Sequence, residues 1–196
     1  MEIKNLNLVD YIKVYDSVIE ERVLETFLEI CKDKKYVPGL IGGNTKGILN
    51  TNIRKADLWN LSNKDKSLTT VHWYNFFRYF FSLKHEEYML NFKNDIIPLI
   101  IPKINEIQIL KYEVESHYTF HTDQSPNSNR QWSSIFFANE DYEGGDLIIS
   151  TPDGGARNNI KKKKNRLVIW PSNFMYPHTV LPVTKGIRYT IVSWAQ

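Results

Sequence analysis

The chain has 196 residues, of which 42% are hydrophobic and 13% aromatic, so it is long and apolar enough for one well-cored domain. Its formal net charge of +3 comes partly from the lysines at 161–164, which excludes a surface that is basic throughout, as in many nucleic-acid-binding proteins. The single cysteine, Cys31, excludes an intrachain disulfide and a cysteine zinc site, and no apolar run is long enough to span a membrane. Because no secretory signal pattern is visible either, we expect a cytoplasmic protein.

The N-terminal half predicts a short strand, an amphipathic helix, a loop and further helices. Residues 11–19 alternate as a strand does, and Ser17 is placed to cap a helix over about 18–33. Apolar residues recur at helical spacing there and predict one buried face: Val23, Leu24, Phe27, Leu28 and Cys31. Residues 38–53 are rich in glycine and asparagine and predict a loop that can contain a hairpin.

Two further segments, 67–83 and 85–100, have the pattern of helices. The first carries a stripe of four aromatic residues, Phe76, Phe77, Phe80 and Phe81, which we interpret as core packing. His72 and His85 lie in these segments, and we interpret both as surface or packing histidines rather than as ligands.

After Pro102 the chain changes to short segments rich in β-branched and aromatic residues, separated by turns. These segments are "EIQILKYEVE", "HYTFHTD", "QWSSIFFANE", "GDLIIST", "RLVIWPS", "HTVLPV" and "IRYTIVSWAQ". So many strands in the last 95 residues or so favour a β-sandwich or jelly roll. The fold class predicted is therefore mainly β with N-terminal helices, in a single domain.

A candidate metal site lies at the end of one of these strands. His121 and Asp123 are two residues apart, so in extended chain both side chains point to the same face. Such a pair arises easily by chance, and a third ligand is needed. His178 begins a later strand and is the first choice for the third ligand. His117 lies four residues before His121, and so on the same face of the strand, and it ranks second. Two histidines and one carboxylate are the usual ligand set of a non-haem Fe(II) centre.

Arg188 lies in an otherwise apolar strand, where an unpaired guanidinium would be costly. If the iron centre used 2-oxoglutarate, the far carboxylate of this co-substrate would need a cation, and an arginine matches it with two hydrogen bonds. The alternative is that Arg188 faces solvent or pairs with a nearby acid such as Glu113.

Three ordered blocks carry a resemblance to a known family. They are "KYEVESHYTFHTD", "NRQWSSIFFANEDYEGGDLIIS" and "RLVIWPSNFMYPHTVLPVTKGIRYTIVSW". Together they resemble the 2-oxoglutarate- and Fe(II)-dependent dioxygenases of the prolyl 4-hydroxylase type, including the oxygen-sensing prolyl hydroxylases. The resemblance covers about 80 residues. It implies a double-stranded β-helix (jelly roll) core over about 106–196, supported by a helical region with a lid loop over about 1–105.

The resemblance also implies roles for particular residues. The metal ligands would be His121, Asp123 and His178; the co-substrate residues Arg188, Tyr112 and Thr190; and the substrate-side residues Tyr118, Arg130 and Trp194. One departure is that a tyrosine of some relatives is replaced here by Phe136 or Phe137. The pair Gly144 and Gly145 is interpreted as shaping the barrel, and the lysines at 161–164 as a solvated loop rather than a polyanion site.

The function implied is hydroxylation of an unactivated C–H bond, with Fe(II), 2-oxoglutarate and O2 as cofactors, ascorbate as reductant, and succinate and CO2 as co-products. A proline in a peptide or protein is the favoured substrate, and residues 38–53 are a candidate lid over it. Three alternatives remain open. The substrate is a free amino acid or small metabolite, or a nucleic-acid base, although the second arginine of the base demethylases is missing after Arg188. The third is a metal-free jelly roll that only binds.

Overall fold

The computed structural model describes residues 7–42, 47–93, 99, 101–126 and 128–196. Its helices are η1 (Leu8–Tyr11), α1 (Glu21–Asp33) and α2 (Leu68–Leu90). Its strands are β1 (Lys13–Asp16), β2 (Val37–Pro38), β3 (Arg54–Lys55), β4 (Asp57–Leu61), β5 (Ile104–Tyr112), β6 (His117–His121), β7 (Trp132–Phe137), β8 (Glu143–Gly144), β9 (Leu147–Ser150), β10 (Arg157–Ile160), β11 (Arg166–Pro171), β12 (His178–Val180), β13 (Val183–Lys185) and β14 (Arg188–Ala195). No helix among the described residues has both the length and the apolar character needed to cross a membrane.

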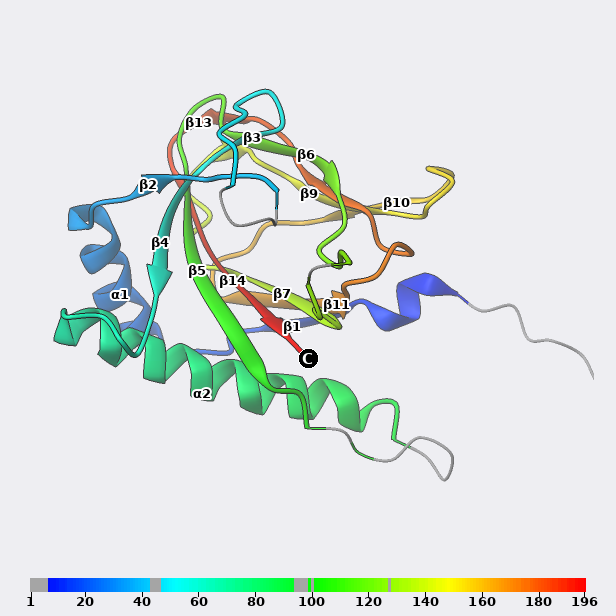
Figure 1. Cartoon of the computed structure of the whole chain (residues 1–196), viewed down its shortest axis with the longest axis horizontal. Coiled ribbons are helices and arrows are strands. Elements are labelled where there is room, and N and C mark those ends of the chain that lie inside the picture. Colours follow the sequence, from blue (N-terminus) through cyan, green and yellow to red (C-terminus); the bar gives the residue numbers. More distant parts are fainter. Residues whose placement is uncertain (1–6, 43–46, 94–98, 100, 127) are drawn as a thin grey trace, which may run out of the picture.

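Two antiparallel sheets face each other and are joined by a short third one (Figure 1). The larger sheet has the strand order β1-β11-β7-β14-β5-β4-β2, and the smaller one has the order β10-β9-β12-β6-β3. Strands β13 and β8 form the third sheet. Apolar side chains of the two larger sheets meet in one buried cluster, which includes Leu110 and Ile135 from one sheet and Leu147 and Val180 from the other. This cluster is the interior of the barrel.

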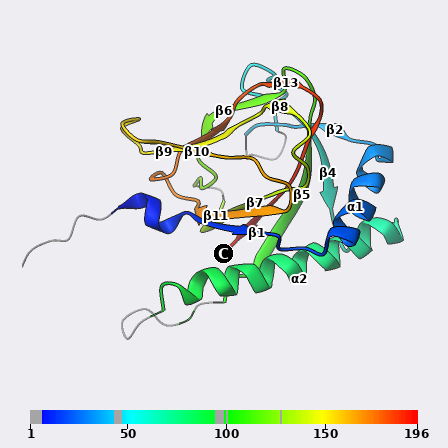
Figure 2. The ribbon, with the colours of Figure 1, turned by 180° about the vertical axis from the view of Figure 1, so that it is seen from behind.

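The larger sheet is covered on its outer face by α1 and α2 (Figures 1 and 2). Strand β14 shows how the two faces divide. Tyr189 and Ile191 pack with the helices, whereas Val192 and Trp194 point into the barrel. Every residue of β14 is buried. A strand buried on both faces lacks an exposed polar face, and the polar residues of β14, Arg188, Thr190 and Ser193, are buried with the rest.

The helical segments are partly as predicted. The predicted aromatic stripe lies in the core, where Phe77 contacts Phe27 of α1 and Phe80 contacts Phe136 of β7. The prediction of two helices was wrong, because α2 runs unbroken from Leu68 to Leu90, and the later part of the second segment lies outside the described residues. The Ser17 cap was also wrong. Ser17 lies ahead of α1, whose N-cap is Glu20, and has a positive φ of 55°. Its backbone N–H donates to the Asn165 carbonyl.

The N-terminal half contributes strands as well as helices. β1 was predicted, whereas β3 and β4 were not. β3 belongs to the smaller of the two facing sheets and β4 to the larger one. In the loop 38–53, Ile41 and Ile48 form the closing bridge of a hairpin, and residues 43–46 lie outside the described part. Two of the lysines at 161–164 form ion pairs within the molecule. Lys163 pairs with Asp16 at 2.9 Å, and Lys164 pairs with Glu21.

Candidate metal centre and its cavity

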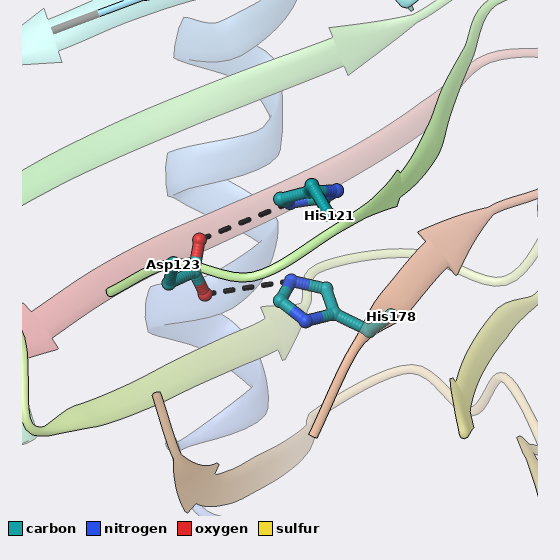
Figure 3. A group of neighbouring side chains, drawn as sticks. All are labelled: His121, Asp123 and His178. Carbon is teal, nitrogen blue, oxygen red and sulfur yellow. Dashed lines mark ion pairs between the residues drawn. The ribbon is translucent and has the colours of Figure 1, made fainter. Parts of the chain in front are cut away.

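Three potential metal ligands meet where β6 and β12 run side by side (Figure 3). His121 ends β6 and lies opposite His178, the first residue of β12. Asp123 follows His121 by two residues and turns back toward both rings. Its Oδ1 lies 3.8 Å from Nε2 of His121, and its Oδ2 lies 3.4 Å from Nε2 of His178. One ligand atom from each residue falls within 4.8 Å of the other two.

Backbone carbonyls fix which ring nitrogens face the cluster. Nδ1 of His121 lies 2.8 Å from the Thr119 carbonyl, and Nδ1 of His178 lies 3.1 Å from the Tyr176 carbonyl. A carbonyl accepts only, so each Nδ1 carries a proton, and in the neutral form of each ring the lone pair is on Nε2. Both lone pairs are therefore free for a cation at the carboxylate. Burial lowers the pKa of His121 to about 3, with the His178 ring adding to the effect, so this imidazole is neutral and able to ligate near neutral pH.

Two serines hold the carboxylate in place. The Ser133 hydroxyl donates to Oδ2 of Asp123 at 2.6 Å, and the Ser172 hydroxyl lies 2.7 Å from that of Ser133. Burial alone would raise the pKa of the Asp123 carboxyl, but His178, His121 and the Ser133 hydrogen bond together hold it below its ordinary value. The carboxylate is thus ionised and oriented. Two imidazoles and one carboxylate on a common face suit Fe(II), so the residues present fit the metal that the sequence pattern indicated.

His117, the second-ranked third ligand, lies away from this cluster. Its Nδ1 is 3.0 Å from the Glu115 carbonyl, and its Nε2 is 3.3 Å from the Asn52 carbonyl. Both ring nitrogens are therefore engaged by the backbone at the other end of β6. Of the two candidates, the geometry brings His178 to His121 and Asp123.

Arg188 is 0% exposed and lies inside the barrel. Its Cζ is 4.7 Å from the centre of the Tyr112 ring and 5.3 Å from that of Phe137, and its Nη1 donates to the Thr190 hydroxyl at 3.3 Å. Nε and Nη2 have no hydrogen-bond partner, and no acid forms an ion pair with Arg188 in the described part of the chain. Glu113, the alternative partner, is paired with Lys111 instead. A buried guanidinium with two free donors fits a carboxylate-bearing co-substrate.

The surroundings of Arg188 explain two other features of the sequence. Of the two phenylalanines, Phe137 lies in the barrel beside the guanidinium, whereas Phe136 packs on the helix side. Gly145 has a φ of +65°, and a Cβ there would lie 3.1 Å from Cδ of Arg188 and 3.2 Å from the Tyr142 ring. The Gly144-Gly145 turn thus lets the chain pass close to the arginine, in keeping with the predicted shaping role.

A cavity of about 700 Å³ opens beside the three ligands. Its wall includes all three substrate-side residues predicted from the sequence, Tyr118, Arg130 and Trp194, as well as Tyr112. Pro38, Leu40, Ile41 and Gly42 also line it, so the described start of the predicted lid loop reaches the cavity. Arg188 and Thr190 are not part of the wall, whereas Tyr112 lines the cavity and has its ring centre 4.7 Å from Cζ of Arg188.

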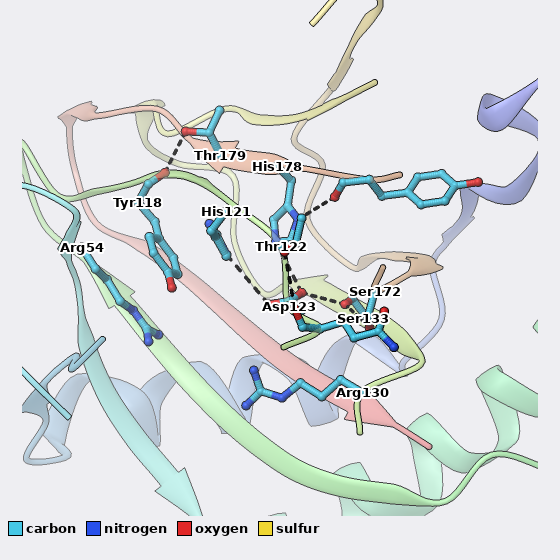
Figure 4. A network of polar contacts seen from close by, with 12 residues as sticks. Arg54, Tyr118, His121, Thr122, Asp123, Arg130, Ser133, Ser172, His178 and Thr179 are labelled. Carbon is cyan, nitrogen blue, oxygen red and sulfur yellow. Dashed lines mark hydrogen bonds and ion pairs between the residues drawn. The ribbon is translucent and has the colours of Figure 1, made fainter. Parts of the chain in front are cut away.

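Figure 4 shows three contributors that reasoning from the sequence missed: Ser133, Ser172 and Arg54. Arg54 belongs to β3, which pairs with β6 so that Arg54 lies beside Tyr118. Both serines lie inside blocks that carry the resemblance, but only the pairing of β7 with β11 brings them together beside Asp123. The strand β3 is two residues long, which is too short for any periodicity to predict.

Comparison with known proteins agrees with this geometry. Residues 107–196 match the model of the 2OG-Fe(II) oxygenase superfamily. A PKHD-type hydroxylase of Crocosphaera subtropica is 35% identical over 103 residues, which cover 48% of this chain and 45% of the relative. A PKHD-type hydroxylase of Herminiimonas arsenicoxydans is 34% identical over 96 residues, covering 44% and 41% respectively. The matched region thus spans less than half the length of these relatives.

Solved structures resemble nearly the whole chain. A prolyl-4-hydroxylase of Pseudomonas putida superposes with a TM-score of 0.70 at 16% identity, covering 96% of this chain and 97% of the other. A prolyl hydroxylase of Trichoplax adhaerens, in complex with a peptide of hypoxia inducible factor, gives 0.70 at 15% identity, covering 94% and 83%. At such low identity the likeness shows the fold, and the predicted double-stranded β-helix is confirmed.

Proposed function

We propose that this chain, in which residues 107–196 form a 2OG-Fe(II) oxygenase superfamily domain, is an Fe(II)- and 2-oxoglutarate-dependent dioxygenase. The observation that carries the proposal is the pairing of two features inside one barrel. His121, Asp123 and His178 converge on one point, and Arg188 lies buried nearby with two free donors and no acid beside it. The first feature suits the metal, and the second suits a dicarboxylate co-substrate.

When bound, Fe(II) and 2-oxoglutarate would allow O2 to hydroxylate an unactivated C–H bond, and succinate and CO2 would be the co-products. The chain's residues bind, orient and exclude water. Asp123 is kept ionised and aimed at the metal by Ser133, and the two histidines keep their Nε2 lone pairs toward it. Arg188, assisted by Thr190, anchors the far carboxylate of the co-substrate. Tyr112 lies against Arg188, and a displacement of its ring would connect the guanidinium to the cavity.

The favoured substrate is a proline in a peptide or protein. The support is the resemblance to the PKHD-type hydroxylases and to the two prolyl hydroxylase structures, one of which holds a peptide. Tyr118, Arg130 and Trp194 would contact the substrate from the cavity wall, and residues 38–53 would cover it. A free amino acid is the second candidate, because the cavity is large enough for one. Ascorbate as reductant and a cytoplasmic location remain predictions.

Succinate formation tests the proposal. The protein is purified without oxygen, loaded with Fe(II), and given 2-oxoglutarate with a panel of proline-containing peptides and, separately, with free L-proline. We expect succinate from the wild type, none from His178→Ala, and from Arg188→Ala a weakened response dominated by a higher KM for 2-oxoglutarate. His117→Ala removes a histidine that lies on β6, the strand of His121, but outside the cluster, and this variant should retain turnover. Absence of succinate from the iron-loaded wild type under every condition would favour a non-catalytic binding module.

A further inference from the structure

Arg54, one of the two arginines that line the cavity, has no counter-ion in the described part of the chain. Arg54 is 9% exposed, and the exposed part of its side chain lines the cavity. Its Nη1 makes one long hydrogen bond, 3.4 Å, to the Leu40 carbonyl, and its Nε has no partner. No carboxylate pairs with it anywhere in the described part of the chain. A nearly buried cation with unused donors is costly unless an anion joins it.

Arg130, which lines the same cavity, makes the contrast clear. Its Nη2 donates to Oε2 of Glu106 at 2.7 Å, and its guanidinium stacks on the Trp194 ring at 3.7 Å. The charge of Arg130 is therefore already balanced by an acid of this chain. Both guanidinium groups point toward the space beside His121 and Asp123 (Figure 4). Of these two arginines, Arg54 is the one whose charge no acid in the described part of the chain balances.

Arg54 is held at a fixed distance from the metal ligands by stacking. Its Cζ lies 4.9 Å from the centre of the Tyr118 ring, and that ring stacks on the imidazole of His121 with centres 3.6 Å apart. One aromatic ring thus separates the guanidinium from the nearest ligand. A group bound to Arg54 would lie about one side chain away from the reacting C–H bond. Burial raises the pKa of the Tyr118 phenol, and the Arg54 charge opposes the rise.

The loaded site would not neutralise Arg54. The two charges of Fe(II) and the one of Arg188 balance the Asp123 carboxylate and the two carboxylates of 2-oxoglutarate. Arg54 is then the remaining uncompensated charge beside the reaction point. Because these charges cancel without the substrate, the substrate is what must supply the anion.

We propose that the substrate of this site carries a carboxylate group that binds Arg54, one aromatic ring away from the metal centre. This inference rests on the proposed function and names a property of its substrate. The carboxylate comes either from an acidic residue near the hydroxylated position of a peptide or from a free amino acid. The planar fork of an arginine binds a carboxylate with two hydrogen bonds, which fixes the register of the substrate as well as its affinity.

Two nearby residues, Gly39 and Leu40, contact the Arg54 side chain. Gly39 packs on the arginine so closely that a Cβ there would lie 3.0 Å from Nε of Arg54 and 2.9 Å from the Ala56 carbonyl oxygen. The Leu40 carbonyl accepts the one side-chain hydrogen bond that Arg54 makes within the described part of the chain. An anion that draws the guanidinium into the cavity would therefore compete with this long bond.

A glutamate scan tests the proposal by binding, without turnover. The probes are capped hexapeptides with one proline, in which glutamate occupies each other position in turn, matched with the same peptides carrying glutamine. L-Proline and L-prolinamide form the second arm and separate the two sources of the carboxylate. Affinities are measured by calorimetry under nitrogen on protein loaded with Fe(II) and 2-oxoglutarate. We expect at least one acidic probe to bind about tenfold more tightly than its amide, a difference of about 1.4 kcal/mol.

Matched variants assign the preference to Arg54. Arg54→Gln should reduce it to less than about twofold, and Arg54→Lys, which keeps the charge but loses the fork, should retain part of it. Lys55→Gln removes the same charge from the neighbouring residue, which pairs with Glu115 outside the cavity, and should keep the full preference. The inference is overturned if no acidic probe is favoured by the wild type, or if the preference survives Arg54→Gln. Failure of 2-oxoglutarate to bind in the same cell would instead reject the proposed function.

Discussion

The Ser133 hydroxyl donates a 2.6 Å hydrogen bond to Oδ2 of Asp123, the same oxygen that faces Nε2 of His178 at 3.4 Å. A carboxylate between two imidazoles is free to rotate, and this bond fixes its plane. Ser133 lies at the start of β7, a strand that contributes no metal ligand itself. The position of one proposed ligand is therefore set from a neighbouring strand, as is common for metal sites.

Ser133→Ala should weaken Fe(II) binding by about 10- to 100-fold, because the remaining ligands would have to orient a free carboxylate. The measurement is an anaerobic Fe(II) titration of metal-free protein. Ser150→Ala is the control, since Ser150 is also buried and hydrogen-bonded but contacts only the carbonyls of Thr151 and Ala156. Equal affinities in the wild type and Ser133→Ala would mean that Asp123 is held by the backbone alone.

Arg188→Met should lower the affinity for 2-oxoglutarate by roughly 2–5 kcal/mol while Fe(II) still binds, because the substitution removes only the partner of the far carboxylate. The same change should leave the free energy of unfolding of the ligand-free protein unchanged or higher, since it removes a buried charge that no acid compensates. Urea unfolding and calorimetry measure the two effects. A large loss of stability with normal 2-oxoglutarate binding would make Arg188 a structural residue only.

Gly145→Ala should destabilise the fold and weaken 2-oxoglutarate binding together, because a Cβ would press on Cδ of Arg188 at 3.1 Å and on Val183 at 3.0 Å. Gly154→Ala is a matched control. Gly154 has a similar φ of +70°, but nothing lies within 4 Å of its Cβ position. Both variants carry the strain of a positive φ, roughly 1–2 kcal/mol, and only Gly145→Ala adds crowding. If the two lose equal stability and neither affects 2-oxoglutarate binding, the turn has no link to the arginine.

His85 should make the protein less stable in acid. It is fully buried on α2, neither ring nitrogen has a hydrogen-bond partner, and burial lowers its pKa to about 3 from the ordinary 6.5. Below pH 6.5 the unfolded chain binds a proton that the folded protein refuses, so unfolding is favoured by about 1.4 kcal/mol per pH unit. This contribution is absent above pH 6.5 and grows as the pH falls toward 3.

The difference between the wild type and His85→Leu isolates this effect from other titrating groups. We expect the free energy of unfolding of His85→Leu to fall less steeply between pH 6.5 and 4. Met89→Leu, a buried change one turn further along the same helix, should follow the wild-type slope. Parallel slopes for the wild type and His85→Leu would show that His85 is solvated or partnered in solution.

The parts of the site that follow from sequence are those that spacing determines. His121 and Asp123 share a face because strand side chains alternate, and Arg188 stands out because a charge in an apolar strand requires a partner. Ser133 and Arg54 were not predictable, because their roles depend on which strands become neighbours. Pairing between β3 and β6 joins residues more than 60 positions apart, and no local pattern records it.

The fold divides in the same way. Most of the strands after residue 103 carry their own turn signals and were predicted, whereas β4, β8 and β10 were missed. β4 is the five-residue strand Asp57–Leu61, which is buried at three of its positions. It is a strand because its whole length pairs with β5. The Ser17 cap failed for a related reason. The side chain of Asn165, from a distant loop, bonds the backbone of Ile19 and holds the segment ahead of α1 in another conformation.

We expect His121, Asp123 and His178 to hold one iron, and the sharpest check is anaerobic Fe(II) calorimetry on metal-free protein. The wild type and His117→Ala should each bind one Fe(II) per chain, and His178→Ala should bind it at least about a hundredfold more weakly. 2-Oxoglutarate should bind tightly only after the iron. Stoichiometric iron binding that survives His178→Ala, or no iron binding by the folded wild type, would rule out this ligand set.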